Sequence, residues 1–273
     1  MTNNILASLV SGSAIPVKRH GLSGFPGSDG NGGFSDTGLK SYYKFNETSG
    51  AIVNQSESDD TLGTGANITI TGATYDDSSA PATFNASMLY DGVNDYGVCG
   101  VSKSQWNFLH NTSAVWSEVM WLRLNDSFPG GEPSLLADGG ASASSVGTDI
   151  YCSSTKQLTM LITNGTDVSI AVSSGDNYVP DVTNWHFYVF TYDYSLGSNN
   201  GKMKRDNDNL VQGSGSSGLV DDNSSYALET MRNPRTGSNY INAYACEWSV
   251  WNKVLSDDDQ TLLWNDGDGM EIY

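Results

Sequence analysis

The sequence is poor in positive charge. Only 13 lysines and arginines stand against 31 aspartates and glutamates in 273 residues, which gives a formal net charge of −18. Proteins that bind nucleic acid or anionic membranes neutralise phosphates with a basic surface. Because the pI is near 4.2, we expect neither nucleic acid nor membrane among the partners of this chain.

Cysteine and long apolar runs are also scarce. Cys99, Cys152 and Cys246 are odd in number and widely spaced, so at least one thiol is unpaired within the chain and no Cys-x₂-Cys zinc motif occurs. We interpret all three as core residues. No run reaches the ~18 apolar residues of a membrane span, and the first residues lack the basic region of a secretory signal.

Residues 1–37 differ from the rest in composition and are predicted to be an extended N-terminal arm. Glycine falls at every third position from Gly21 to Gly33, the spacing that a collagen triple helix requires. Two interpretations stay open: a Gly/Ser linker with accidental spacing, or a short neck that joins three chains. In the second, residues 5–20 attach the protein to a larger particle.

Residues 38–273 are predicted to form one all-β domain. Short alternating or apolar runs are separated every 8–15 residues by Gly, Asn, Asp and Ser clusters, a pattern typical of an antiparallel sandwich. The predicted strands are 39–45, 67–71, 87–92, 95–101, 115–124, 133–138, 147–152, 157–163, 168–173, 184–193, 201–205, 209–213, 227–231 and 241–251. The turn formers at 91–92 and 94–95 indicate a hairpin between two of them.

One short C-terminal helix is predicted after the last strand. Ser256 and Asp259 have the spacing of a capping box, Leu262 and Leu263 supply an apolar face, and Gly267 ends the helix. We expect it to plug one end of the sandwich.

Five stretches, in order along the chain, carry a family resemblance. They are residues 43–50, 88–96, 115–124, 185–193, and 247–256 followed by 263–267. Together they resemble the laminin-G-like, concanavalin A-type lectin and glucanase domains over about residues 39–270. The resemblance implies a jelly-roll sandwich of two curved antiparallel sheets.

Carbohydrate binding is what this resemblance most often implies, through aromatic rings and polar groups on the concave sheet or at loop tips. Because side chains alternate along a strand, we place Trp121, Glu247 and Trp251 on the concave side as ligand-binding residues. The alternative is that these aromatic side chains are core. The same alternation puts Cys246, Trp248 and Val250 in the core.

Glu118 does not fit the alternation. It shares a face with Trp116, Met120 and Leu122, so either the strand is exposed at an edge there or the carboxylate is paired.

No catalytic pattern accompanies the fold prediction. Two acids spaced for glycoside hydrolysis on one strand do not occur, and a nucleophilic serine would need a histidine. His20 lies in the arm, His110 precedes a loop, and His186 is interpreted as a structural residue of a strand. We therefore predict a protein that is not an enzyme.

Metal binding stays open. Relatives often bind calcium through six to eight oxygens, and oxygen-rich loops lie at 76–77, 205–209 and 221–223. Loops of the kind at 206–209 and 221–223 are more often plain turns. No cofactor is predicted with certainty, and calcium is the one ion left open.

Three functions are consistent with these observations. The first is a structural virion protein, a capsid decoration or tail fibre component from salty water, whose arm binds other virion proteins, whose neck makes a trimer, and whose sandwich contacts a host surface or a glycan weakly. The second is a secreted or cell-surface carbohydrate-binding module of a marine or halophilic microbe. The third is a glycan hydrolase or lyase with an unusual carboxylate pair. The arm and the absence of catalytic residues favour the first.

Overall fold

A computed structural model describes residues 34–273 apart from 59–60, 77–78, 101, 126–130, 141, 180–181, 216–217 and 222–225, and not the side chains of 208–209. The arm and the glycine-rich neck were predicted at 1–37, and residues 1–33 lie outside the described part. Asp36–Tyr273 forms one compact unit.

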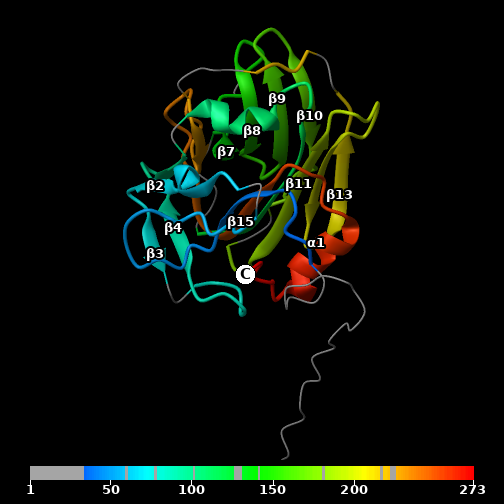
Figure 1. The fold of residues 1–273 in the computed structure, drawn as a ribbon. Coiled ribbons are helices and arrows are strands. Elements are labelled where there is room, and N and C mark those ends of the chain that lie inside the picture. The colour runs from blue at the N-terminus through cyan, green and yellow to red at the C-terminus, as the bar shows by residue number, and fades with distance from the viewer. Residues whose placement is uncertain are drawn as a thin grey trace, which may run out of the picture. The chain divides into compact units, whose positions relative to one another are not determined.

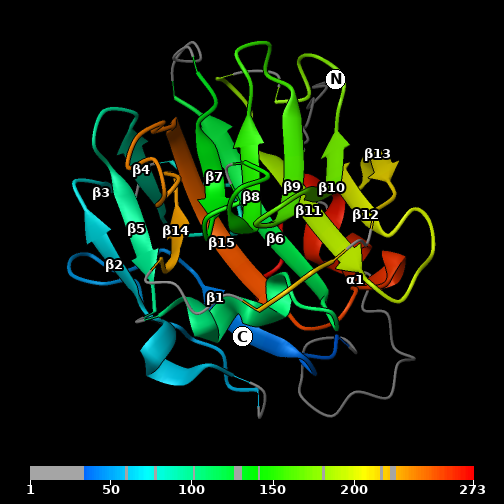
Figure 2. The ribbon, with the colours of Figure 1, turned by 90° about the horizontal axis from the view of Figure 1, so that it is seen from above.

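The alternating runs pair into two antiparallel sheets that pack face to face, as predicted (Figures 1 and 2). The eight-stranded sheet has the order β13 (Asp208–Gly213), β12 (Gly201–Arg205), β11 (His186–Asp193), β6 (Val115–Leu124), β15 (Asn242–Trp251), β4 (Ser87–Asp91) and β3 (Thr74–Asp76), with β1 (Leu39–Tyr43) beside β15. The seven-stranded sheet has the order β10 (Val168–Ser173), β9 (Leu158–Asn164), β8 (Val146–Cys152), β7 (Ser134–Ala137), β14 (Leu228–Thr230), β5 (Tyr96–Cys99) and β2 (Ile68–Thr71).

Each predicted strand overlaps an observed one, and three short elements were not predicted. They are the edge strand β3 and two 3₁₀ helices, η1 (Gly63–Ala66) and η2 (Lys103–Leu109). Three to seven residues are too few to show a period, which explains the omission. The Trp106 ring of η2 is fully buried, and its Nε1 donates to the carbonyl of Cys99 at 3.0 Å.

The turn at 91–95 is not the predicted hairpin. β4 pairs with β15 and β3 in one sheet, whereas β5 pairs with β14 and β2 in the other. Asp95 Oδ2 accepts from the backbone N–H of Asp91 at 2.8 Å, and Asp91 Oδ1 accepts from that of Val93. These side-chain bonds replace the ladder of a hairpin, so the turn formers carry the chain from one sheet to the other.

The predicted capping box begins helix α1 (Asp257–Trp264). Ser256 Oγ accepts from the Asp259 N–H at 3.1 Å, and the Asp259 carboxylate accepts from the Ser256 N–H. The helix ends at Asn265, in the left-handed region at φ 47°, before the predicted Gly267. Leu263 is buried, whereas Leu262 is half-buried.

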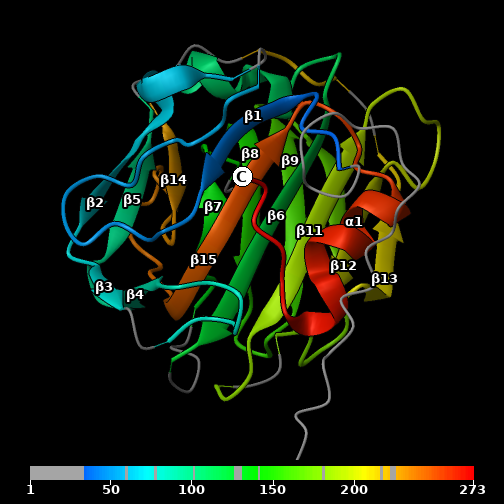
Figure 3. The same cartoon turned by 60° about the horizontal axis from the view of Figure 1, so that its bottom comes forward.

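α1 covers a sheet face and does not plug an end of the sandwich. Figure 3 shows α1 and the segment after it lying across the outer face of the eight-stranded sheet, in front of β6 and β11. Outward-facing residues of that sheet, such as Val119, Phe187 and Val189, are each at most 3% exposed. Within the described residues, no helix combines the length and apolar character needed to cross a bilayer.

All three cysteines are buried in the domain. Cys99, Cys152 and Cys246 are buried, unpaired thiols among the described residues, which confirms their interpretation as core residues. Burial raises the pKa of the Cys152 thiol to about 12, and it also raises those of Cys99 and Cys246 well above the usual range. At neutral pH the three thiols are therefore protonated.

The core also contains ionisable groups. Lys103, His110, Glu118 and Asp138 are each at most 1% exposed, and His110 Nε2 lies 3.2 Å from Asp138 Oδ2. Glu118 lies on β6, which is central and not an edge strand. Burial, and then the Asp138 charge, raises the pKa of Glu118 well above its usual range. The carboxyl is therefore kept neutral by desolvation, a third outcome besides the two that the sequence left open.

Candidate functional site

The three predicted ligand residues all lie on the eight-stranded sheet. Trp121 comes from β6, and Glu247 and Trp251 come from β15; they are 2%, 6% and 0% exposed. Trp121 and Glu247 line the same cavity of about 10 Å³, which the side chains of α1 and the following segment close. Because the described residues bury all three side chains, their role in ligand binding stays a prediction that requires this cover to move.

A β-bulge explains how Glu247 reaches that face. Cys246 pairs with Trp121, and Ser249 pairs with Val119, so two residues of β15 stand opposite one residue of β6. Glu247 has φ 51°, in the left-handed region. The bulge puts Cys246 on the face of Trp121, so the prediction that Cys246 shares a face with Val250 is wrong.

The Glu247 carboxyl keeps its proton at neutral pH. Its pKa is raised to about 8, chiefly by burial and to a smaller extent by the Glu271 charge, against the lowering effect of the Tyr42 hydroxyl and of Lys44. Tyr42 Oη donates to Glu247 Oε2, and the N–H of Ile272 donates to Tyr42 Oη at 3.2 Å. These bonds fasten the C-terminal segment over the predicted site.

A polar cavity of about 150 Å³ lies on the outer side of the seven-stranded sheet, under the loop 231–241. Asp149 and Tyr151 are two residues apart on β8 and share a face, and Leu161 pairs with Asp149 from β9. The lining consists of Glu132, Ser134, Asp149, Tyr151, Leu161, Asn233, Thr236 and Asn239. We call this cavity the Asp149 pocket.

Asp149 is the buried acid of this pocket. Its Oδ2 accepts from Asn233 Nδ2 at 2.7 Å, whereas Oδ1 and the Ser134 hydroxyl have no hydrogen-bond partner among the described residues. The pKa of Asp149 is raised to about 7, chiefly by burial and to a smaller extent by the charges of Asp138 and Glu132, against the lowering effect of Ser134 and Asn233. A buried acceptor without a donor costs about 1–3 kcal/mol, so the pocket favours a ligand that donates a hydrogen bond.

The walls of the pocket are less polar. Tyr151 is half-buried, and burial raises the pKa of its hydroxyl, which therefore stays a donor at neutral pH. Leu161 is 8% exposed. A ring and an aliphatic side chain beside a carboxyl and an amide provide both the apolar surface and the convergent polar groups of a small-molecule site.

The loop 231–241 is fixed to the sheet by side-chain bonds. Glu229 accepts two hydrogen bonds from Arg232, at 2.6 and 2.7 Å, and the Arg232 guanidinium lies 3.3 Å from the centre of the Tyr96 ring. Arg235 donates to the hydroxyls of Ser142 and Ser144 at 2.5 and 3.3 Å. Asn233 is therefore held in place before any ligand arrives.

The structure also bears on His186 and on the oxygen-rich loops that were considered for calcium. His186 Nδ1 lies 2.6 Å from Asp206 Oδ2, which supports the interpretation of His186 as a structural residue. The Asp206 carboxyl thus has a structural partner, which favours the interpretation of the loop 205–209 as a turn. Among the described residues, no three His, Cys, Asp or Glu side chains gather closely enough to hold a metal ion. Calcium binding stays untested, because Asp77, Asp222 and Asn223 lie outside the described part.

No family model and no curated protein matches the chain. Among solved structures, the sialidase of Trypanosoma rangeli, in a covalent intermediate with 2,3-difluorosialic acid, superposes with a TM-score of 0.59 at 13% identity over 90% of this chain and 36% of that one. The binding domain of botulinum neurotoxin DC in complex with SialylT superposes with a TM-score of 0.57 at 13% identity over 84% and 52%. The chain thus spans about a third to a half of these structures, and the likeness shows the lectin-like sandwich fold.

Proposed function

We propose that the protein is a glycan-binding module whose binding site is the Asp149 pocket. The observation that carries this proposal is the buried Asp149–Asn233 pair beside Tyr151, with one carboxyl oxygen still lacking a donor. Sugar hydroxyls donate to such oxygens, and the C–H face of a sugar ring packs on an aromatic ring.

The charges of the pocket indicate neutral sugars. Glu132 and Asp149 both line it, and its lining includes no lysine or arginine among the described residues. A carboxylate on the ligand would face like charges. A cavity of about 150 Å³ is below the ~300 Å³ of a drug-sized site, so the bound unit is a single terminal sugar.

The similar structures support a glycan as the class of ligand, and they leave open whether this chain catalyses a reaction. One similar structure is a sialidase bound to a sialic acid derivative, and the other is a toxin binding domain in complex with SialylT. Enzymes and binding domains thus share this sandwich, and fold alone does not decide between them. That this chain is not an enzyme stays our prediction from its residues.

The test is a screen of neutral oligosaccharides, followed by calorimetric titration of the best ligand with the full chain. Asp149→Asn keeps the size of the side chain but exchanges an acceptor for a donor, so we expect at least a tenfold loss of affinity, about 1.4 kcal/mol. Asp176→Asn, in an exposed loop, is the control and is expected to bind as the wild type does. If the Asp149→Asn variant binds the ligand with the affinity of the wild type, the Asp149 pocket is not the glycan-binding site.

A place on a virus particle stays a prediction that depends on the arm. If the neck joins three chains, light scattering will give the mass of a trimer for the full chain and of a monomer for a chain that starts at Gly38. Equal monomer masses for both would show that the glycine spacing is accidental, and the cell-surface or secreted module would then be favoured.

A further inference from the structure

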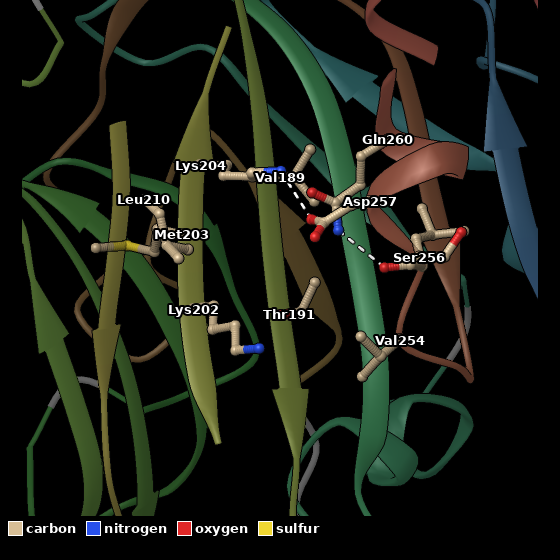
Figure 4. Close-up of a pocket in the computed structure, with 11 residues that line it drawn as sticks. Val189, Thr191, Lys202, Met203, Lys204, Leu210, Val254, Ser256, Asp257 and Gln260 are labelled. Carbon is tan, nitrogen blue, oxygen red and sulfur yellow. Dashed lines mark hydrogen bonds and ion pairs between the residues drawn. The ribbon is translucent and has the colours of Figure 1, made fainter. Parts of the chain in front are cut away.

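A second cavity, of about 250 Å³, lies on the other sheet, between the start of α1 and the strands β11, β12 and β13 (Figure 4). We call it the Lys202 cleft. Val189 and Thr191 form its floor, residues 254–260 form one side, and Lys202 and Lys204 form part of the other. It is separate from the Asp149 pocket, which lies on the opposite sheet.

The two lysines of the cleft differ in their partners. Lys204 Nζ is engaged, 2.9 Å from Asp257 Oδ1 and 3.4 Å from Asn207 Oδ1. Lys202, two residues earlier on the same face of β12, forms no hydrogen bond or ion pair with any described residue, and Figure 4 shows its ammonium beside Thr191. The Lys202 charge also acts on Asp257, whose pKa both lysines lower. Two lysines against this one carboxylate leave one positive charge in the cleft for an anionic ligand, in a protein that carries a net charge of −18.

Gln260 adds an unsatisfied acceptor. Its side chain is 5% exposed, and its Nε2 donates to the carbonyl of Leu255 at 2.8 Å. Its Oε1 is buried and has no partner among the described residues. Because a buried acceptor without a donor costs about 1–3 kcal/mol, a ligand that offers a hydroxyl here is favoured.

The rim of the cleft is apolar. Leu210 is 52% and Val254 is 37% exposed, although both are large aliphatic side chains. They provide surface for the C–H groups of a ligand whose polar groups point inward.

We propose that the Lys202 cleft binds an acidic monosaccharide unit. Lys202 pairs with its carboxylate, Gln260 Oε1 accepts from a ring hydroxyl, and the ring lies against Leu210 and Val254. This site adds to the proposed function a second ligand class, since the acidic Asp149 pocket selects neutral sugars.

Three ligands separate an acidic sugar from other small carboxylates. We expect sodium glucuronate to bind the full chain saturably, glucose to bind this cleft at least tenfold more weakly, and hexanoate, which has no hydroxyl, also at least tenfold more weakly. Chemical shift changes of the Lys202 and Gln260 signals report on this cleft alone. Hexanoate binding as tight as that of glucuronate would overturn the proposal, as would no saturation by about 10 mM glucuronate, ten times the Kd of a ~1 mM site.

Two variants, Lys202→Gln and Gln260→Leu, test the proposed contacts, and two others, Lys156→Gln and Asp149→Asn, are controls. Lys202→Gln should weaken glucuronate at least tenfold, whereas Lys156→Gln, on the turn between β8 and β9, should change it less than twofold. Gln260→Leu should weaken glucuronate and leave hexanoate unchanged. Asp149→Asn should not affect glucuronate, so a failure of this site is distinguishable from a failure of the Asp149 pocket. Unchanged glucuronate affinity in Lys202→Gln would contradict the proposal.

Discussion

Between pH 5 and pH 8.5 the melting temperature of the protein is expected to fall by at least ~10 °C. The cause is a set of buried acids whose folded-state pKa lies above the ordinary value: Asp149 at about 7, Glu247 at about 8, and Glu118, whose pKa is raised well above its usual range. A shift of three pKa units is worth about 4 kcal/mol, and 1 kcal/mol moves the melting temperature of a domain of this size by about 2–4 °C.

The sign follows from proton counting. Above pH 5 the unfolded chain has lost the protons of these acids, while the folded chain keeps them, so the folded state binds more protons and stability falls as pH rises. His110 acts in the same direction. Burial lowers its pKa, but Asp138 and the Val220 carbonyl outweigh burial, so its pKa is raised and its contribution is lost as pH rises through that value.

Calorimetric scans across this pH range test the expectation. Glu118→Gln removes one of the titrating groups and should flatten the pH dependence, whereas Glu57→Gln, at an exposed position, should not. Scans in high salt separate the effect from repulsion among surface charges, because salt screens exposed charges far more than buried ones. A melting temperature that is constant or rises toward pH 8.5 would contradict the assignment.

His110→Ala is expected to destabilise the fold by about 3–5 kcal/mol. The substitution removes the imidazole that lies 3.2 Å from the buried Asp138 carboxyl, and removing one partner of a buried pair is far more costly than removing both. Adding Asp138→Asn should therefore recover part of the loss. Denaturant unfolding at pH 6 measures both effects.

The control for this variant is a second histidine with a shorter contact. His186 Nδ1 lies 2.6 Å from Asp206 Oδ2, but the two side chains are 15% and 29% exposed. Because a solvated pair contributes about 1 kcal/mol or less, His186→Ala should cost much less than His110→Ala. An equal loss of unfolding free energy in the two variants would show that burial does not decide the strength of these pairs.

Period-two alternation was sufficient to predict nearly every strand, and it failed where the backbone departs from regular geometry. In β15 the extra residue at Glu247 reverses the face of Cys246 relative to Val250. A glycine would have marked a bulge at positive φ, but a glutamate carries no such signal. The turn at 91–95 has the composition of a hairpin, and only the pairing of β4 and β5 with different partners shows that it joins two sheets.

The sequence pattern could predict the strand residues of the Asp149 pocket but not its loop residues. Asp149 interrupts a predicted strand and alternates with Tyr151, which indicates an acid and a ring on one face. Asn233 lies 84 positions further along the chain, and no local pattern joins them. The resemblance directed attention to the concave sheet, where Trp121 and Glu247 are buried under α1 and the segment after it, and where Trp251 is buried as well.

This cover has a consequence for how the protein tolerates change. The central strands of the eight-stranded sheet, β6, β11 and β15, are buried on both faces. Substitutions at most of their positions therefore destabilise the domain through lost packing. The loop 231–241 contacts the outer side of the other sheet through a few side chains of Arg232, Asn233 and Arg235. Its exposed tip can vary in sequence without disturbing the core, so recognition can diversify while the fold stays constant.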